Sequence, residues 1–519
     1  MAGEKAAKEK NAAAKAGDER EFVKDIADRN SDFPQWYTDV VLRTGLVDYG
    51  PVRGSMVIRP YGFALWENMQ VALDRRIKAT GHENAYFPLL IPESLLRKEA
   101  EHVEGFAPEV AWVTHGGGEE LTERLVVRPT SETVICAMYA KWIGSWRDLP
   151  VLINQWANVV RWEKTTRPFL RTLEFLWQEG HTAHATEEEA EEETLKMLEV
   201  YRDFVETELA VPVITGRKTA REKFAGALRT YSIEALMADG RALQAGTSHN
   251  LGQHFAKVFD IKFLDADNVL KYVWQTSWGV STRLIGAIIM VHGDERGLML
   301  PPRVAPLQAV IVPITPEKRR LEVLAEARRL HDELAGLEVR ESGAAAKGLR
   351  VKLDDREGFT PGWKYNEWEM KGVPVRIEIG PRDVDNRQVV LVRRDNGEKT
   401  VMPREGLAAA LGRLLDEVQA GMFARAEKFR EENTRTVRDF AEFQEVMEET
   451  RGFVRAPWCG DDACEAEVKE KTGATIRCLP MSEGGSEEEQ PGIGAQSGAH
   501  VCVHCGRSAK KTAYFAKAY

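Results

Sequence analysis

The sequence has little cysteine, no long apolar run and no excess of positive charge, and each shortage excludes a class of protein. Six cysteines in 519 residues are too few for a disulfide-stabilised secreted scaffold and favour a cytoplasmic protein. No apolar run is long enough to cross a bilayer, so no membrane association is expected. The formal net charge of -10 argues against wholesale electrostatic capture of nucleic acid. Any RNA-binding surface must therefore be local.

The composition is that of a soluble globular protein, with 43% hydrophobic and 29% charged residues. A chain of this length is too long for one compact core, so about three domains are expected. The first twenty residues mix Ala, Lys and Glu without an apolar segment, which excludes a secretory signal and predicts a disordered tail. We predict the following division: tail 1–20, first domain 21–300, second domain 301–408, third domain 409–519.

Local patterns indicate the fold of these segments. Apolar residues between Trp66 and Ile77 recur at helical spacing. Thr186 and Glu189 have the spacing of a capping box before another helix. Strands separated by long connections indicate an antiparallel sheet with flanking helices, an α+β fold. In residues 301–408, strands alternate with helices, which predicts a small α/β domain with a partly parallel sheet.

The most informative segment covers residues 159–181. An apolar strand ends at Arg161 and Glu163, a basic loop follows, and a second strand returns with Glu179 and His181. This arrangement puts a guanidinium group, carboxylates and an aromatic wall on one sheet surface. Such a surface suits a nucleotide phosphate lying beside a small charged metabolite.

This segment resembles motif 2 of class II aminoacyl-tRNA synthetases and is closely similar to that of prolyl-tRNA synthetases. Upstream, Thr130-Ser131-Glu132 agrees with the same family, and downstream residues 275–286 resemble motif 3. The match runs from about residue 22 to 519. It implies the class II antiparallel-sheet catalytic domain, followed by an α/β anticodon-binding domain and a small C-terminal zinc-binding α/β domain. The type is archaeal/eukaryotic-like, without the inserted editing domain.

The resemblance also implies the activity: ATP-dependent ligation of L-proline to tRNA(Pro) through a prolyl-adenylate, with Mg2+ accompanying the ATP phosphates. Arg161 and Arg283 are the implied catalytic residues. Arg161 would contact the amino-acid carboxylate and the α-phosphate, and Arg283 would hold the γ-phosphate. Guanidinium groups placed there stabilise the negative charge that builds during phosphoryl transfer.

Two sets of binding residues follow from the same resemblance. A cyclic secondary ammonium offers two donors, which a hydroxyl and a carboxylate can satisfy together, and aromatic faces suit its ring. The residues implied to bind proline are Phe106, Thr130, Glu132, Arg161, Trp177, Glu179, His181, Phe224, His249, Ser277 and Gly279. Those implied to bind ATP are Arg161, Glu163, Arg171, Thr172, Gln244, Thr247, Thr282 and Arg283.

Four cysteines near the C-terminus have metal-ligand spacing. Cys459-x4-Cys464 and Cys502-x2-Cys505 suit a tetrahedral four-thiolate zinc site. Such a site is structural, because four protein ligands leave no position for a reacting water. The two remaining thiols, at positions 136 and 478, lie in apolar patterns that predict buried, inert cysteines.

Two partners are implied besides proline. Residues 62–92 resemble motif 1, the helix–strand unit through which class II synthetases form homodimers. The second domain resembles the anticodon-binding domain, where Glu367, Lys371 and Arg382 are candidates to lie near anticodon bases. For any one of these three, a solvated surface charge is the competing interpretation.

Two alternative functions were weighed. A threonyl enzyme of the same subclass would need zinc-binding Cys and His in the catalytic core, and none are so arranged. A non-catalytic RNA-binding or regulatory paralogue would be favoured by loss of Arg161 or Arg283, and both are present. Taken singly, Thr130-Ser131-Glu132 is typical of a helix N-cap and each arginine of a surface ion pair. The combination favours the ligase.

Overall fold

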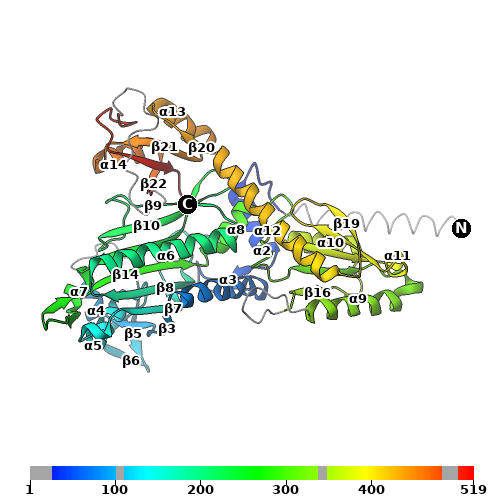
Figure 1. The fold of residues 1–519 in the computed structure, drawn as a ribbon, viewed down its shortest axis with the longest axis horizontal. Coiled ribbons are helices and arrows are strands. Elements are labelled where there is room, and N and C mark those ends of the chain that lie inside the picture. The colour runs from blue at the N-terminus through cyan, green and yellow to red at the C-terminus, as the bar shows by residue number, and fades with distance from the viewer. Residues whose placement is uncertain (1–25, 101–109, 337–347, 482–500) are drawn as a thin grey trace.

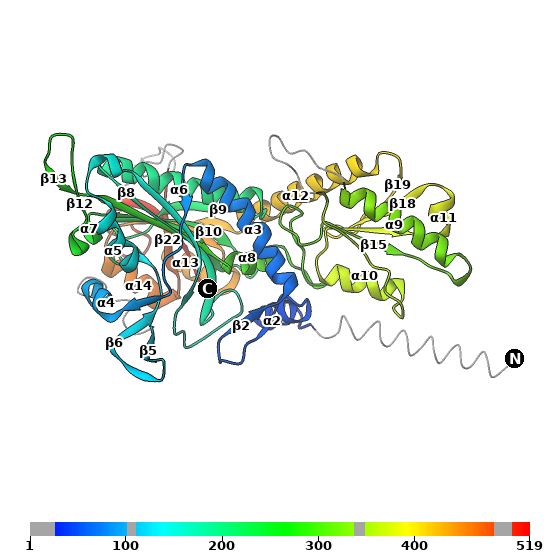
Figure 2. The ribbon, with the colours of Figure 1, turned by 90° about the horizontal axis from the view of Figure 1, so that it is seen from below.

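The computed structural model describes residues 26–100, 110–336, 348–481 and 501–519. One long sheet and one shorter sheet dominate these residues, and they lie at opposite ends of the molecule (Figures 1 and 2). The prediction of an α+β fold is confirmed. None of the described helices is both long and apolar enough to span a bilayer.

The long sheet has eleven strands among the described residues. In sheet order they are β20 (Thr434–Thr436), β21 (Phe453–Trp458), β23 (Lys511–Ala516), β22 (Thr475–Pro480), β9 (Val213–Arg217), β10 (Arg229–Leu236), β11 (Ala242–Gly252), β14 (Trp274–Ser281), β8 (Glu174–His184), β7 (Val151–Val160) and β3 (Glu83–Asn84). From β22 to β7 every neighbour is antiparallel, and β3 runs parallel to β7. The antiparallel catalytic sheet expected from the sequence is present.

Helix α6 (Glu187–Thr207) crosses one face of this sheet (Figure 1). Its buried residues Met197, Tyr201 and Phe204 join the core formed with the sheet. Thr186 Oγ1 accepts a hydrogen bond from the Glu189 backbone N–H at 3.2 Å, as the predicted cap requires. The Glu189 carboxylate reaches back to the N–H of Ala185, at 3.0 Å, one residue beyond the capping-box position.

Helices α2 (Phe33–Arg43), α3 (Pro60–Ala79) and α8 (Arg283–His292) enclose the same core. The helix predicted around residues 66–77 is α3. It starts with Pro60, whose fixed φ suits the first helical position. It ends before Gly81, whose φ of 91° suits a residue without a side chain.

Smaller elements border the sheet. A three-stranded sheet of β4 (Leu90–Pro92), β6 (Glu119–Val127) and β5 (Ala111–Gly116) lies near β3 and β7, as Figure 1 shows. The remaining elements here are α4 (Glu93–Ala100), α5 (Glu132–Trp142), η1 (Trp146–Asp148), α7 (His254–Phe259), and the hairpins β1 (Val47–Tyr49)–β2 (Met56–Ile58) and β12 (Lys262–Leu264)–β13 (Leu270–Tyr272).

The second sheet has the order β16 (Val351–Leu353), β15 (Ala309–Pro313), β17 (Val375–Ile379), β18 (Gln388–Arg393), β19 (Lys399–Pro403). β15 is parallel to both of its neighbours and the other pairs are antiparallel, so the predicted partly parallel sheet is confirmed. Its helices are η2 (Glu317–Arg319), α9 (Arg320–Gly336), α10 (Pro361–Met370) and α11 (Pro381–Asp385).

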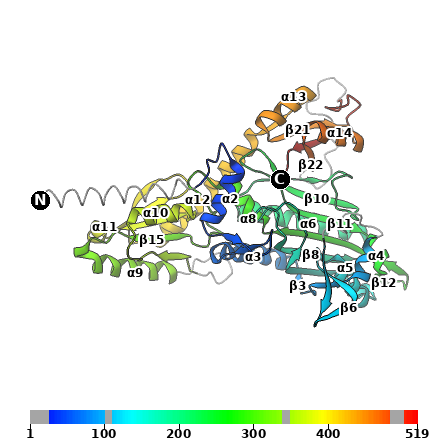
Figure 3. The same ribbon diagram turned by 180° about the vertical axis from the view of Figure 1, so that it is seen from behind.

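Helix α12 (Leu407–Glu432) runs from this second sheet past α8 to β20 (Figure 3). Beyond it lie α13 (Phe440–Glu445), η3 (Val446–Thr450) and α14 (Asp462–Thr472). The sequence did not indicate that the strands of this last part extend the long sheet. The joining pair, β22 and β9, is short and its two strands lie far apart in the chain, so no local periodicity reveals it.

Candidate active site

An open pocket lies on the long sheet where β8, β14 and β11 run side by side. About 1030 Å³ of space lies between its walls, part of it open to solvent. The sequence-predicted residues that line it are Thr130, Glu132, Arg161, Trp177, Glu179, His181, Phe224, Gln244, Thr247, His249, Ser277, Gly279 and Arg283. The three sequence blocks therefore meet in one cavity.

The register of the three strands explains this convergence. Ser277 of β14 is paired with His181 of β8 on one side and with His249 of β11 on the other. Two residues along β14, Gly279 is paired with Glu179. Side chains two apart on a strand point to the same face of the sheet. The paired rows therefore form one polar floor, and at Gly279 an added Cβ atom would lie 3.1 Å from the Gln178 carbonyl oxygen and 3.5 Å from the Trp177 ring.

Glu179 and His181 form a buried pair in this floor. His181 Nε2 lies 3.0 Å from Glu179 Oε2, while Glu179 Oε1 accepts hydrogen bonds from Gln155 Nε2 at 2.7 Å and from Ser131 Oγ. Burial lowers the pKa of His181, but the hydrogen bond and charge of Glu179, with the charge of Glu132, outweigh it. The net pKa of His181 lies above its ordinary value, so the environment favours the charged imidazolium.

The second histidine of the pocket is in the opposite state. Burial, with the positive charge of His181, lowers the pKa of His249 to about 3. His249 Nδ1 lies 2.9 Å from Thr230 Oγ1, and its ring centroid is 4.8 Å from that of Phe224. A neutral imidazole beside a phenyl ring gives this wall an apolar character.

Thr130 and Glu132 approach the pocket from the start of α5. Both are buried, and the Thr130 hydroxyl donates to Glu132 Oε2. Glu132 is the first residue of the helix, where the helix dipole and the unpaired backbone N–H groups favour a negative charge. The Glu132 side chain therefore lies at a helix start that lines the pocket, where a bound cation can reach it.

Arg161 follows β7 directly, and its guanidinium group lies over two aromatic rings. Its Nε donates to the Pro129 carbonyl oxygen at 3.1 Å. Its guanidinium carbon lies 5.3 Å from the centroid of the Phe175 ring and 5.8 Å from that of Trp177. Aromatic faces attract a guanidinium group while leaving its N–H donors available on the edge.

Arg283 begins α8 on the same pocket. Its backbone N–H donates to Ser281 Oγ at 3.2 Å and its Nε donates to the Leu170 carbonyl oxygen at 3.3 Å. Burial, together with the positive charges of Arg161 and Arg171, lowers the pKa of Arg283 to about 10. The group stays protonated at neutral pH. Several guanidinium groups gathered at one cavity form an anion site.

Five buried polar atoms of these elements have no hydrogen-bond partner among the described residues: Trp177 Nε1, Gln275 Oε1, Ser277 Oγ, Trp278 Nε1 and Thr282 Oγ1. Leaving a buried polar atom unpaired costs roughly 1–3 kcal/mol, so unpaired atoms of this kind are uncommon in folded proteins. Trp177 and Ser277 line the pocket, where a bound molecule can supply the missing partner.

Several predicted residues lie elsewhere. Glu163, Arg171, Thr172 and Thr282 do not line the pocket, and Phe106 lies outside the described residues. Glu163 Oε2 is 3.5 Å from Arg171 Nη1. Thr172 lines a neighbouring open groove, and Thr282 precedes Arg283 at the start of α8.

Nine residues that line the pocket were not predicted as site residues: Phe175, Glu222, Lys223, Thr230, Ala245, Gly246, Trp278, Val280 and Ser281. Phe175 is two residues before Trp177 on β8, so the strand alternation could have identified it. Glu222 and Lys223 lie on the loop between β9 and β10, and no local pattern marks them.

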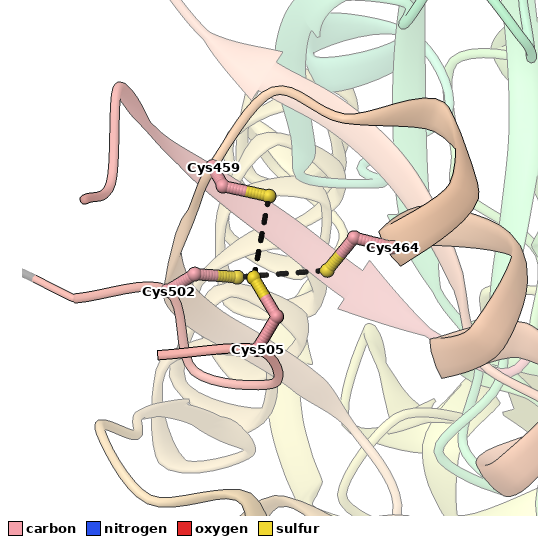
Figure 4. A group of neighbouring side chains, drawn as sticks. All are labelled: Cys459, Cys464, Cys502 and Cys505. Atoms are coloured by element: carbon pink, nitrogen blue, oxygen red, sulfur yellow. Dashed lines mark hydrogen bonds between the residues drawn. The ribbon is translucent and has the colours of Figure 1, made fainter. Parts of the chain in front are cut away.

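The four predicted cysteine ligands come together (Figure 4). All four Sγ atoms lie within 4.8 Å of one another, with 3.7 Å separating Cys464 from Cys502 and 3.7 Å separating Cys459 from Cys505. Thiolates arranged tetrahedrally about 2.3 Å from Zn2+ are roughly 3.8 Å apart, so the cluster fits that ion. His504, which the sequence did not single out, has Nδ1 3.4 Å from Cys464 Sγ. The other two thiols are buried, as predicted: Cys136 and Cys478.

The three anticodon candidates do not converge. Glu367 accepts hydrogen bonds from Arg356 Nη2 at 2.5 Å and from Lys371 Nζ at 2.9 Å, so two candidates pair with each other. Arg382 lies apart from them, in the first turn of α11. None of the three lines the pocket beside the second sheet, which is lined in part by Tyr365, Glu369, Arg376, Arg393 and Lys399. The Tyr365 hydroxyl is buried and finds no partner in the described part of the chain.

Comparisons with known proteins agree with this layout. Family models match for the tRNA synthetase class II core domain (G, H, P, S and T) over residues 112–292, the anticodon binding domain over 308–414, and the C-terminal domain of prolyl-tRNA synthetase over 440–519. The chain is 62% identical over 501 residues to a proline--tRNA ligase of Natranaerobius thermophilus, covering 96% of this chain and 99% of that one. It is 58% identical over 504 residues to proline--tRNA ligase 2 of Clostridioides difficile, covering 97% and 100%.

Among solved structures, the chain is similar to prolyl-tRNA synthetase from Cryptosporidium parvum complexed with halofuginone and AMPPNP. The TM-score is 0.86 at 41% sequence identity, and the similarity covers 95% of this chain and 96% of that one.

The raised pKa of His181 gives a pH-dependent contribution to stability. A group whose pKa is higher in the folded than in the unfolded state adds to the free energy of unfolding. This stabilisation is complete below the pKa of the unfolded state, about 6.5 for histidine, and is lost as the pH rises through the pKa of the folded state. The His181→Gln variant keeps a hydrogen-bond donor but not the charge. We expect wild type to exceed this variant in free energy of unfolding by more at pH 6 than at pH 9, measured by urea titration. An equal difference at both pH values would contradict the assignment.

Proposed function

This chain belongs to the prolyl-tRNA synthetase family, and on that premise we propose which of its side chains carry the ATP-dependent ligation of L-proline to tRNA(Pro). In the first step a proline carboxylate oxygen bonds to the α-phosphorus of ATP and pyrophosphate leaves. In the second, a hydroxyl of the terminal tRNA ribose attacks the prolyl carbonyl carbon and AMP leaves. The assignment rests on one observation, the meeting of Arg161, Arg283 and Glu132 at one pocket.

Proline occupies the acidic half of the pocket in this proposal. Thr130 and Glu132 accept the two N–H donors of the ring ammonium, supported by their burial and by the helix start that favours the carboxylate. His249 and Phe224 supply the less polar wall that the ring methylenes require. The other residues proposed to surround proline are Arg161, Trp177, Glu179, His181, Ser277, Gly279 and, outside the described residues, Phe106.

ATP occupies the cationic half. Arg161 contacts the proline carboxylate and the α-phosphate together, which screens their repulsion as the new bond forms. Arg283 holds the γ-phosphate. Arg171 is close enough for its charge to act on Arg283, which supports its assignment to the β- and γ-phosphates. The other residues proposed for ATP are Glu163 on the adenine side, Thr172, Gln244, Thr247 and Thr282.

ATP enters as its Mg2+ complex, and the cation supplies further positive charge on the phosphates. No carboxylate of the pocket is assigned as its ligand. The part played by this chain is to bind the anion with preformed guanidinium groups and to orient the carboxylate of proline toward the α-phosphorus.

The central test is proline-dependent ATP–pyrophosphate exchange. Arg161→Ala removes charge stabilisation at the α-phosphate, and loss of one such group lowers rates by about 10²–10³-fold. We expect exchange to fall by at least that factor while circular dichroism and the unfolding midpoint change little, because Arg161 is a rim residue rather than a core residue. Arg147→Ala, at an exposed arginine of η1, is the matched control and should exchange like wild type.

Undiminished exchange in Arg161→Ala would contradict the catalytic role of Arg161. Absence of exchange in wild type would instead favour a non-catalytic RNA-binding paralogue.

The segment between motifs 2 and 3 bears on fidelity. From residue 163 to residue 282 the chain is described throughout, and its helices and strands are α6, α7 and β8 to β14. No separate hydrolytic module lies in this interval. A pocket excludes a smaller ligand by only about 1–3 kcal/mol. We therefore predict measurable activation of alanine without clearance in cis.

Activation of alanine is measured by alanine-dependent pyrophosphate exchange, and clearance by hydrolysis of purified alanyl-tRNA(Pro) over time. Rapid hydrolysis above the rate in buffer alone would refute the absence of editing.

We propose that the four cysteines bind a structural Zn2+. The proposal is supported by the mutual sulfur distances, which fit tetrahedral coordination, and by the burial of three of the four residues. The ion would contribute to folding and not to the reaction, since four thiolates complete its coordination.

We expect purified protein to contain about one equivalent of Zn2+ by elemental analysis. Cys464→Ser should lower both the zinc content and the thermal unfolding midpoint. Cys136→Ser removes a buried thiol elsewhere and should leave the zinc content unchanged. Equal zinc contents in the two variants would refute the site.

For tRNA, we propose that anticodon bases enter the pocket beside the second sheet. Its cationic residues and the unpartnered Tyr365 hydroxyl suit an unstacked base and its phosphate. In this proposal Glu367 and Lys371 do not contact the bases, and their ion pair stabilises the helix end next to the pocket. Arg382 would contact RNA only outside the pocket. The proposed boundaries at residues 300 and 408 assign most of this pocket to the second domain, and Arg296 of the first domain also lines it.

We also propose a homodimer formed through residues 62–92, in a cytoplasmic protein. The elements around α3 expose apolar side chains that a second copy can cover. They are Tyr49, Val52, Val57, Phe63, Val71 and Tyr86.

The proposed domain division treats residues 1–20, which lie outside the described residues, as a tail. It assigns residues 409–519 to the zinc-binding domain.

A further inference from the structure

The C-terminal region, residues 434–481 and 501–519, is joined closely to the catalytic sheet. Strand β22 pairs with β9 at Leu479↔Arg217 and Pro480↔Gly216. A Cβ atom added to Gly216 would lie 2.4 Å from the Leu479 carbonyl oxygen and 2.6 Å from Cys478 Cβ. Real Cβ atoms do not approach so closely, so glycine is what allows this strand contact.

A buried ionic triad reinforces the junction. Glu234 Oε2 accepts hydrogen bonds from Arg477 Nε at 3.0 Å and Nη2 at 2.9 Å. Glu234 Oε1 accepts from Lys218 Nζ at 2.7 Å and Ser232 Oγ at 2.8 Å. The side chains of Glu234, Lys218 and Arg477 are 0%, 2% and 8% exposed. Removing Glu234 would leave two buried cations without their anionic partner, whereas removing Arg477 leaves the Glu234–Lys218 pair in place.

Glu234 connects this triad to the pocket without lining it. It lies on β10 where the pairing with β11 is irregular: Ile233 is paired with Gly246, and Glu234 with Gln244. Gln244 and Gly246 both line the pocket. At such a bulge the strand direction depends on local side-chain contacts. The orientation of the Glu234 side chain therefore bears on where Gln244 points.

A second contact acts on the same strand from the C-terminal end of the chain. The Ala242 N–H donates to the Lys517 carbonyl oxygen at 2.8 Å, and the Tyr519 N–H donates to the Ala242 carbonyl oxygen at 3.1 Å. Ala242 is two residues before Gln244 on β11. The position of the C-terminus beside β10 in Figure 3 agrees with this pairing. The C-terminal region thus holds β10 through Glu234 and β11 through Ala242.

We propose that Arg477 is a positioning residue for ATP: through Glu234 it fixes the β10–β11 bulge and with it the nucleotide side of the pocket. The inference rests on the proposed function, since it assumes that Gln244 faces ATP. It gives the C-terminal region a part in nucleotide binding in addition to any structural zinc. The negative charge of Glu234 raises the pKa of Arg283, whereas burial and the charge of Arg477 lower it. The triad is therefore close enough to Arg283 to act on it electrostatically.

The test uses the full-length protein and separates KM for ATP from KM for proline in pyrophosphate exchange. For Arg477→Met we expect KM for ATP to rise by about tenfold and KM for proline to change by less than about twofold. Arg477→Lys, which restores the charge without the bidentate geometry, should recover part of the affinity for ATP. KM does not depend on the concentration of active enzyme, so partial misfolding lowers only the apparent kcat.

The matched control is Arg430→Met. Arg430 Nη1 donates to the Val213 carbonyl oxygen on β9 at 2.9 Å, so its loss loosens the same part of the sheet without touching Glu234. KM for ATP should stay within about twofold of wild type. Equal rises in Arg477→Met and Arg430→Met, or equal rises in both KM values, would overturn the inference and leave only a packing role.

If Arg477→Met does not fold, Arg477→Gln keeps a hydrogen-bond donor for Glu234, whose carboxylate still pairs with Lys218 at 2.7 Å. The same selective rise in KM for ATP is expected, and an unchanged KM would overturn the inference. Absence of exchange in wild type would contradict the proposed function instead, so the two failures are distinguishable.

Discussion

The repulsion between the guanidinium groups of Arg161 and Arg283 at one cavity, with Arg171 close enough to add its charge, is the constraint on which the rest of the structure depends. The pKa of Arg283 is held at about 10 by burial and by the charges of Arg161 and Arg171. Because like charges repel, each of these groups must be held in place by other contacts. Arg161 is held by the Pro129 carbonyl oxygen and the rings of Phe175 and Trp177, and Arg283 by the Leu170 carbonyl oxygen. Because the donors are held before the anion arrives, binding a triphosphate relieves repulsion with little reorganisation.

The opposite half of the pocket carries the complementary charge and so sets the direction in which an amino acid lies. In the proposed assignment, Glu132 faces the ammonium group of the amino acid and Arg161 faces its carboxylate. A zwitterion placed between them has one favourable orientation, with its carboxylate toward the phosphate site. The two histidines differ in charge: His181 favours its charged form, which offsets its partner Glu179, and His249 remains neutral. The pocket therefore orients its substrate by electrostatics as well as by shape.

The sequence predicted the chemistry of this site better than its boundaries. Alternation on β8 places Trp177, Glu179 and His181 on one face, and that property is local. The facing positions on β14 and β11 depend on strand register, which the family resemblance supplied and periodicity could not. Glu222 and Lys223 carry no local signal, because a loop is placed by what it packs against. The anticodon candidates Glu367 and Lys371 were chosen for their charge, yet each charge is largely satisfied by an ion pair within the fold.

The extension of the catalytic sheet by C-terminal strands has a physical reason beyond nucleotide binding. Without β22, strand β9 would be an edge with unpaired backbone groups, next to strands that carry the pocket. Exposed edges invite pairing with other chains and fray more readily than central strands. Pairing at Gly216, the salt bridges of Glu234 and the bridge at Ala242 move the sheet edge outward to β20, away from the pocket. The nucleotide side of the site thus lies in the interior of a continuous sheet, where small changes in strand position are resisted from both sides.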